Sequence, residues 1–176
     1  EKRQLYTTAV PVKIHDLNSE LVARIVTRHG PECSVVSLEE ALGCDLVLLA
    51  TNAGTPYVPM SVRFQPNQLI LNISLRDLHP ESIKTANNVF DDVEHCLKAN
   101  TTPHLLEQLN GNRDFVTGTL AEFICSEKQL DPDRPTVFSP FGLGILDLAV
   151  AQSLYEHVQA SGGGLRVPDF HGDMKR

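Results

Sequence analysis

Polar side chains stand at the ends of three apolar runs that are typical of parallel strands. Asp16 closes the first run, Thr51 and Asn52 follow the second, and Asp77 comes just after the third. In open α/β sheets, ligands bind at the edge where the carboxyl ends of the strands meet. These positions together therefore predict a ligand-binding edge.

Asp16 carries the most specific of these signals. It stands between a predicted strand and a predicted helix, where dinucleotide-binding folds place the carboxylate that binds the adenosine ribose hydroxyls. A carboxylate there favours NAD, because it would repel the 2′-phosphate of NADP. On position alone, Asp16 is equally consistent with an ordinary turn or N-cap aspartate.

Gly142 and Gly144, within "SPFGLG", have the spacing of a pyrophosphate-binding turn. Such a turn needs a preceding strand, a third glycine or alanine, and a following strand that ends in an acidic residue. Asp147 stands at the third position and no strand follows, so the match fails. Glycines in a first helical turn permit either close packing or the approach of a ligand.

Ser139 and Pro140 instead have the pattern of an N-cap and a first helical residue. Apolar residues then recur every fourth position, which predicts a buried helical stripe. The stripe consists of Leu146, Val150, Leu154 and Val158.

The remaining chain alternates between strand and helix patterns, which predicts a Rossmann-type doubly wound parallel sheet with C-terminal helices. The apolar run 45–51 is continuous, as in strands that are buried on both faces. The other strands are expected at 9–16, 33–36, 67–75 and 87–90. Helices are expected at 18–30, 37–42 (with a capping box), 92–100, 102–109 and 117–127, and a proline-rich hinge at 131–136. Residues 1–8 are interpreted as the end of a charged helix and its exit turn.

Composition excludes several classes of partner. The 176 residues are 41% hydrophobic and 21% charged, and the net charge of −7 comes without a cluster of lysine or arginine. This argues against nucleic acid or an anionic membrane as a partner and favours a small neutral or amphoteric ligand. No apolar run is long enough to span a bilayer.

Cysteine and histidine predict no metal site. The four cysteines are widely spaced without a C-x-x-C pair, so we expect buried, reduced thiols and a reducing cytoplasm. His79 and His95 are expected on the surface or on a helix face, because no ligand spacing accompanies them.

Several motifs resemble the NAD-binding part of the ornithine cyclodeaminase and mu-crystallin superfamily. These are "VKIHD", "SLEEALGCDLVLLATNAGTPYV", "LILNISLRDLHPESI", "GNRDF" and "TVFSPFGLGILDLAVAQSLYE". Within it, "NISLRDL", "GNRDF" and "SPFGLG" are most similar to the dehydrogenases of 2,3-diaminopropionate biosynthesis. The resemblance extends from about Val10 to Tyr155.

This resemblance implies a longer, two-domain enzyme that forms a homodimer. A first lobe would supply basic residues for substrate carboxylates, and the glycine fingerprint with the first Rossmann strand would come just before Glu1. Residues 1–135 are then a partial NAD-binding Rossmann domain, and residues 136–176 are a helix and tail returning toward the first lobe.

In the usual strand order the first strand is central. The strands ending at Asp16 and beginning near Asp45 are therefore expected to flank an open place, filled by an upstream segment, a second copy or a rearranged sheet. We accordingly expect residues 1–176 alone to bind NAD poorly and to have no turnover.

The resemblance also implies a chemistry. NAD would take hydride from the glutamate Cα of N-(2-amino-2-carboxyethyl)-glutamate, and hydration of the imine would release 2-oxoglutarate and 2,3-diaminopropionate, precursors for a siderophore or an antibiotic. Asp77 matches the catalytic acid/base of the family, and Arg76 is a candidate for a substrate carboxylate, although a surface arginine is an open alternative. The implied cofactor contacts are Asp16, Thr51, Asn52, Ser74, Ser139 and Gly142.

Two other functions stay open. One is another imine reaction on the same fold, either ornithine cyclodeamination or ketimine reduction. The other is a non-catalytic binding protein of the crystallin type.

Overall fold

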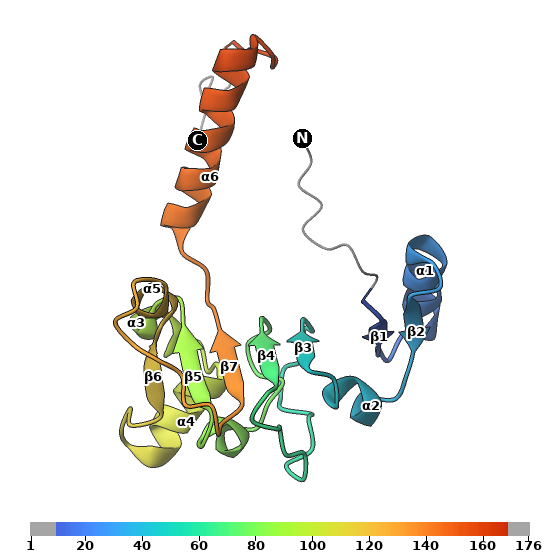
Figure 1. Ribbon diagram of the computed structural model, residues 1–176, viewed down its shortest axis with the longest axis vertical. Coiled ribbons are helices and arrows are strands. Elements are labelled where there is room, and N and C mark those ends of the chain that lie inside the picture. The colour runs from blue at the N-terminus through green and yellow to red at the C-terminus, as the bar shows by residue number, and fades with distance from the viewer. Residues whose placement is uncertain (1–9, 169–176) are drawn as a thin grey trace, which may run out of the picture. The chain divides into compact units, whose positions relative to one another are not determined.

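The computed structural model describes residues 10–168, which contain two parallel sheets (Figure 1). The smaller sheet pairs β1 (Val12–Ile14) with β2 (Cys33–Val35), and α1 (Ser19–His29) connects the two strands. The short helix α2 (Leu38–Leu42) leads from β2 toward the larger sheet. This part confirms the strand and helix patterns expected near Asp16.

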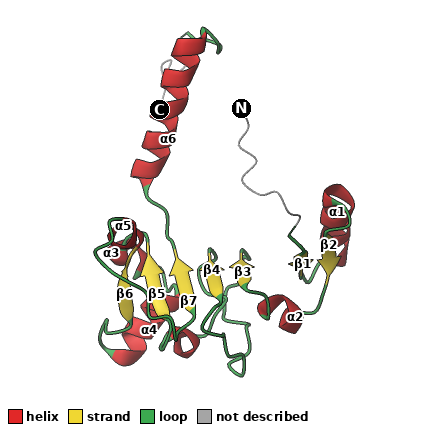
Figure 2. Cartoon of the chain, in the orientation of Figure 1, coloured by secondary structure: helices red, strands yellow, loops and turns green. Residues whose placement is uncertain are grey.

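The larger sheet has the strand order β3-β4-β7-β5-β6, and every pair in it is parallel (Figures 1 and 2). Its strands are β3 (Leu46–Leu49), β4 (Leu69–Asn72), β5 (Asn87–Phe90), β6 (Val116–Thr119) and β7 (Thr136–Ser139). The remaining helices of this unit are η1 (Pro80–Ile83), α3 (Val93–Cys96), α4 (Thr102–Asn110) and α5 (Leu120–Ile124). Because all strands run the same way, their carboxyl ends meet at one edge.

The expected α/β class with a parallel sheet is thus confirmed. Among residues 10–168, β1 is paired only with β2, and β3 only with β4. The strand that we expect between β1 and β3 is therefore not among the described residues. Our expectation that an upstream segment, a second copy or a rearranged sheet occupies that position stays a prediction. The interpretation of residues 1–8 also lies outside the described part of the chain.

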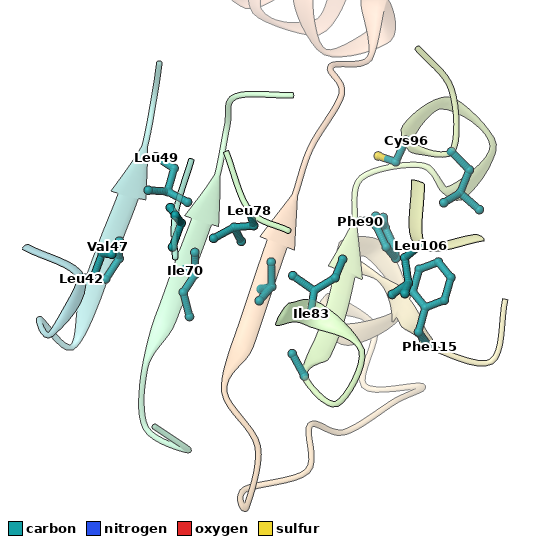
Figure 3. Close-up of a cluster of buried hydrophobic side chains, with 14 residues drawn as sticks. Leu42, Val47, Leu49, Ile70, Leu78, Ile83, Phe90, Cys96, Leu106 and Phe115 are labelled. Carbon is teal, nitrogen blue, oxygen red and sulfur yellow. The ribbon is translucent and has the colours of Figure 1, made fainter. Parts of the chain in front are cut away.

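One face of the larger sheet is covered by an apolar cluster (Figure 3). Val47, Ile70 and Val137 lie side by side in the strand register and contribute to this cluster together with Leu106 of α4 and Ile83 of η1. Buried apolar surface of this kind is the main favourable term in folding. The cluster fixes β4 and β7, whose ends form the candidate site.

The expectation that β3 is buried on both faces is wrong in the described structure. Val47 and Leu49 are buried, whereas Leu46 and Leu48 on the opposite face are exposed. A parallel sheet is covered on both faces when its crossover connections are helical. Here the connection 50–68 contributes Val58, Val62 and Phe64 to the cluster on the buried face. Within residues 10–168, the opposite face of β3 stays exposed.

Two helices begin after polar N-cap residues, and the sequence analysis expects the cap of the helix at 37–42. The side chain of Asn18 accepts hydrogen bonds from the backbone N–H groups of Glu20 and Leu21 at the start of α1, and Gly30 ends that helix. At α2, the Ser37 hydroxyl accepts from the backbone N–H of Glu40. Short polar side chains satisfy helix N–H groups that lack an intrahelical partner.

The helical interpretation of 117–127 is partly wrong. Thr117 to Thr119 belong to β6, and the helix α5 begins only at Leu120. Thr119 is its N-cap in a complete capping box with Glu122, whose carboxylate accepts from the Thr119 backbone N–H. The expected helix 92–100 is likewise reduced to the four residues of α3.

Residues from Gly142 onward form a second compact unit, which consists mainly of α6 (Gly144–Ser161). The two compact units meet after Phe141, and β7 is an inner strand of the larger sheet. The domain boundary expected after Pro135 stays a prediction. Ser139 is the last residue of β7, so its predicted role as a helix N-cap is wrong. Gly142 has a φ of +97°, a conformation that strongly favours glycine.

The predicted buried stripe of this helix is also wrong within the described residues. Leu146, Val150 and Leu154 are exposed, and Val158 is only partly buried. Apolar side chains point to all sides of α6, so a spacing of four does not select a buried face.

The cysteines are all free, but only Cys96 is buried. Cys33 and Cys44 are partly exposed and Cys125 is exposed, which corrects the expectation of four buried thiols. Within the described part of the chain, no helix is long and apolar enough to cross a membrane.

Candidate functional site

At the carboxyl edge of the larger sheet, two of the sequence-predicted residues, Thr51 and Ser74, contact a third, Asp77. The Thr51 hydroxyl, just after β3, donates to Oδ1 of Asp77 at 2.7 Å. The Ser74 hydroxyl, just after β4, donates to Oδ2. Asp77 itself is fully buried, with an exposed fraction of 0%. Its carboxylate is thus held by hydroxyl donors from the ends of two neighbouring strands.

Tyr57 is a member of this cluster that the sequence analysis missed. Its phenol oxygen lies 3.5 Å from Oδ2 of Asp77, and the backbone N–H groups of Tyr57 and Val58 both donate to the Asp77 carbonyl at 3.1 Å. Burial, followed by the charge of Asp77, raises the pKa of Tyr57 to about 12. The phenol therefore keeps its proton near neutral pH. The proline in "GTPYV" marks a loop, but nothing in the sequence joins that loop to Asp77.

Arg76 bridges two loops. Its Nη1 donates to the Gly54 carbonyl at 3.4 Å, and its Nη2 donates to the Ala99 carbonyl at 2.9 Å. Its Nε is buried without a hydrogen-bond partner. These contacts give Arg76 a structural task in the loops beside Asp77, and its contact with a substrate carboxylate stays a prediction.

Ser139 lies at the next strand along this edge. Its hydroxyl accepts a hydrogen bond from Nδ2 of Asn72 at 3.0 Å, and only 5% of Ser139 is exposed. Asn72, which ends β4, is 2% exposed, and its Oδ1 is buried without a hydrogen-bond partner. Asn72 is a second residue that sequence reasoning missed, although its place at the end of an apolar run was a usable signal.

A shallow hollow of about 10 Å³, room for roughly one water molecule and partly open to solvent, lies beside these side chains. Ser74 and Ser139 both line it, together with Asn72, Leu75, Cys96, Thr101, Pro103, Pro140 and Phe141. The hollow thus joins the polar ends of β4 and β7.

The turn after β7 is held by a carboxylate at the end of β5. The Phe141 backbone N–H donates to both Oδ1 and Oδ2 of Asp91, at 3.0 and 3.1 Å. The Cys96 thiol lies 3.0 Å from Oδ1 of Asp91 and 3.0 Å from the Ser139 carbonyl. Burial and then the hydrogen bond to Asp91 raise the pKa of Cys96 to about 12, so this residue is a thiol donor rather than a nucleophile.

Asp16 lies at the end of β1 in the smaller sheet, and, after burial and Asp77, its charge is the smallest of the causes that raise the pKa of Tyr57. Its Oδ1 accepts from the Asn18 backbone N–H at 2.7 Å. It lines a hollow of about 320 Å³, partly open to solvent, with His15, Arg24, Arg28 and His29 among the other lining residues. Asp16 therefore makes the hydrogen bond of an ordinary turn aspartate, and its carboxylate is also accessible from the hollow.

Among the other predicted positions, Asn52, His79 and His95 make no hydrogen bond to Asp77 in the described structure. Asn52 is exposed beside Thr51. Gly142 belongs to the second unit. His79 is partly buried, and His95 is exposed beside Asp92. Within residues 10–168, no group of three or more histidine, cysteine or acidic side chains is arranged to hold a metal ion.

Comparison with known proteins gives relatives that fit this architecture. No model of a known protein family matches the chain. The chain is 28% identical, over 84% of its length, to the N-((2S)-2-amino-2-carboxyethyl)-L-glutamate dehydrogenase of Staphylococcus aureus, and it covers 47% of that protein. It spans about half the length of the curated relatives that it matches.

Solved structures show the same fold. An archaeal alanine dehydrogenase dimer with bound NAD matches 90% of the chain with a TM-score of 0.72 and 24% identity, the chain covering 52% of it. The chain has a Rossmann-type fold. A probable ornithine cyclodeaminase from Bordetella pertussis Tohama I matches 88% of this Rossmann-type chain, with a TM-score of 0.67 and 21% identity, over 53% of its own length.

The resemblance to the ornithine cyclodeaminase and mu-crystallin superfamily that the motifs indicate is thereby confirmed. In the Rossmann-type sheet, the motif "NISLRDL" supplies Asn72, Ser74 and Asp77, and "SPFGLG" supplies Ser139. Some of the motifs that carry the resemblance thus form the carboxyl-edge cluster, whereas "VKIHD" and "GNRDF" contribute no residue to it in the described part of the chain.

Proposed function

We propose that the chain is the NAD-binding part of an amino-acid dehydrogenase of the ornithine cyclodeaminase and mu-crystallin superfamily. The observation that carries this proposal is the buried Asp77 carboxylate, held by Thr51 and Ser74 at the carboxyl edge of a Rossmann-type sheet. An organised carboxylate beside a dinucleotide fold suits the proton transfers that accompany hydride transfer.

Several described residues fit a bound dinucleotide. Asp16 lies at the end of β1 and lines an accessible hollow, as a carboxylate for the adenosine ribose must. The unpartnered Oδ1 of Asn72 and the hydroxyl of Ser139 offer polar contacts at the other end of the edge. When bound, NAD supplies the hydride acceptor. The glycine-rich turn that would hold the pyrophosphate is not among residues 10–168.

We further propose N-(2-amino-2-carboxyethyl)-glutamate as the substrate. With NAD as the hydride acceptor, oxidation at its glutamate Cα would give a C=N bond, and one water would add to that bond. Cleavage of that C–N bond gives 2-oxoglutarate and 2,3-diaminopropionate, with NADH and one proton as the other products. The dehydrogenase of Staphylococcus aureus and the "NISLRDL", "GNRDF" and "SPFGLG" motifs support this substrate.

Each residue of the cluster then has a task. Asp77 takes the proton that leaves the substrate nitrogen and returns one to it when the C–N bond breaks. Thr51 and Tyr57 hold the carboxylate in place. Ser139 and Asn72 orient the ligand, and Asp16 binds the ribose hydroxyls.

The test is an assay of the full-length protein with NAD and a panel of amino acids, monitored by NADH absorbance and by detection of the products. NADH with 2-oxoglutarate and 2,3-diaminopropionate in equal amounts supports the proposal. NADH formation with alanine or proline alone would exclude the proposed substrate. No NADH with any substrate would contradict the dehydrogenase assignment.

Ornithine cyclodeamination is the second candidate, favoured by the structural match to the probable cyclodeaminase. That reaction reoxidises the cofactor, so ornithine would give proline and ammonia without net NADH. Following proline formation in the same assay separates the two reactions. We propose that either enzyme acts as a homodimer in the cytoplasm, and that the dehydrogenase supplies a siderophore or antibiotic pathway.

A further inference from the structure

Asp77 has no surface through which a substrate can reach it. Its exposed fraction is 0%, and its carboxylate is covered by the hydroxyls of Thr51, Ser74 and Tyr57. A general acid or base must lie within hydrogen-bond reach of the reacting atom, either directly or through one intervening group. In this arrangement, a proton reaches Asp77 only through one of the three hydroxyls.

Ser74 is the member of the cluster that also lines the hollow between β4 and β7. Its Oγ contacts Oδ2 of Asp77 and lies 3.1 Å from the Leu49 carbonyl. A hydroxyl has one proton to donate and two lone pairs that accept. While Ser74 donates to Asp77, its oxygen still has acceptor capacity for a group in the hollow.

The same hollow offers polar atoms that are ready for a ligand. Asn72 is 2% exposed, and its Oδ1 has no hydrogen-bond partner. Leaving a buried acceptor unpaired is costly, so a donor at this position would be stabilising. The Ser139 hydroxyl accepts from Asn72, which leaves its own proton to donate. The hollow therefore suits a single water molecule, which both donates and accepts.

The other two hydroxyls are less suited to pass a proton. The Thr51 oxygen already accepts from the Ala53 backbone N–H at 3.1 Å. The Tyr57 phenol lies 3.5 Å from Asp77, and its pKa, raised to about 12, keeps it protonated. Neither residue lines the hollow.

We propose that Ser74 is a catalytic proton relay between the hollow and Asp77, rather than a cofactor contact, in an inference that rests on the proposed amino-acid oxidation. As the substrate nitrogen or the attacking water releases a proton, the Ser74 oxygen accepts it. In the same step the existing Ser74 O–H bond breaks and its proton moves to Oδ2 of Asp77. Ser74 ends as a neutral hydroxyl, Asp77 ends protonated, and the reverse step returns the proton.

The test compares Ser74→Ala with the matched variant Tyr57→Phe in the full-length protein, because each removes one hydroxyl from the same Asp77 oxygen. We expect kcat to fall by roughly 10²-fold in Ser74→Ala, to fall far less in Tyr57→Phe, and to be restored in part by Ser74→Thr, which keeps a hydroxyl. NADH affinity, measured by fluorescence, should stay the same in all three variants.

Several results would overturn the relay. Equal losses of kcat in Ser74→Ala and Tyr57→Phe would show that Ser74 only holds Asp77. A larger loss in Tyr57→Phe would assign the relay to the phenol, and a loss of NADH affinity that parallels kcat in Ser74→Ala would make Ser74 a cofactor contact. If the wild-type protein oxidises no amino acid, the proposed function fails instead.

A crystal structure of the full-length protein tests the hollow without any turnover. We expect a water within hydrogen-bond distance of both Ser74 Oγ and Asn72 Oδ1. A dry hollow, or a Ser74 hydroxyl closed off from it, would overturn the relay whatever the substrate.

Discussion

The backbone N–H of Phe141 points at both carboxylate oxygens of Asp91, at 3.0 and 3.1 Å, across fifty residues of sequence. Oδ1 of the same carboxylate also contacts the Cys96 thiol and accepts from the Asp92 backbone N–H. One side chain at the end of β5 thus determines how the chain leaves β7. The turn that it holds follows Ser139 directly and precedes Gly142, both expected at the cofactor.

The first prediction is that Asp91→Asn destabilises the protein, because the amide loses the charge and one acceptor. We expect the free energy of unfolding to fall by about 1.5 to 3 kcal/mol, the range for hydrogen bonds to a charged group. Urea unfolding measures this loss. Asp92→Asn is the matched control, because Asn caps α3 about as well as Asp. Equal destabilisation by the two variants would show that the contact with Phe141 contributes little.

The second prediction concerns Asp77. Asn is nearly isosteric but cannot exchange the proton, so Asp77→Asn should lower turnover by roughly 10² to 10⁴. The affinity for NADH should change little, because the amide keeps the carboxylate's shape and one oxygen acceptor for the neighbouring hydroxyls. Single-turnover kinetics with NAD and substrate measure the chemical step directly. Near-normal turnover in the Asn variant would remove Asp77 from the mechanism.

Much of the sheet could be predicted because its signals are local. The apolar runs of β3 and β4, and the caps Asn18 and Ser37, depend on neighbouring residues alone. The sequence does not predict β6, because "VTGT" is short and leads directly into a capping box. Thr119 therefore both ends a strand and caps a helix. Ser139 was misassigned for a related reason, since a serine before a proline marks an N-cap only when no strand ends there.

The site was predictable at its strand ends but not across its loops. Thr51 and Asp77 follow apolar runs, so their shared edge could be inferred from parallel topology. Ser74 was expected only from the family resemblance, because it lies within the run predicted as strand 67–75. Tyr57 and Asp91 act through contacts with residues distant in sequence, which no local pattern encodes. The burial of Asp77 also depends on how the loop 53–58 folds over it, and this changes the proposed path of its proton.

The third prediction concerns the choice of cofactor. Asp16→Ala should weaken NAD binding by about 1 to 3 kcal/mol, the cost of losing charge-assisted hydrogen bonds. Asp16→Asn keeps an acceptor for the Asn18 backbone N–H, so it separates the loss of charge from damage to the start of α1. Titration of the full-length protein with NAD and NADP measures both affinities. Tighter binding of NADP by the wild type would contradict the assignment, with Arg24 and Arg28 in the same hollow as the candidate cause.

The last prediction is a loss of stability at alkaline pH that depends on Cys96. Burial and the Asp91 carboxylate raise the pKa of this thiol from 9.0 to about 12 in the folded protein. Because the folded protein disfavours the thiolate, the contribution is fully present below about pH 9 and is lost as the pH rises toward 12. Tyr57, whose pKa rises from 10.0 to about 12, adds to the loss over the upper part of this range. Urea midpoints measured from pH 8 to 12 should therefore fall less steeply in Cys96→Ser, which keeps a hydrogen-bond donor that does not titrate. A slope in this variant equal to that of the wild type would show that the buried thiol is not linked to stability.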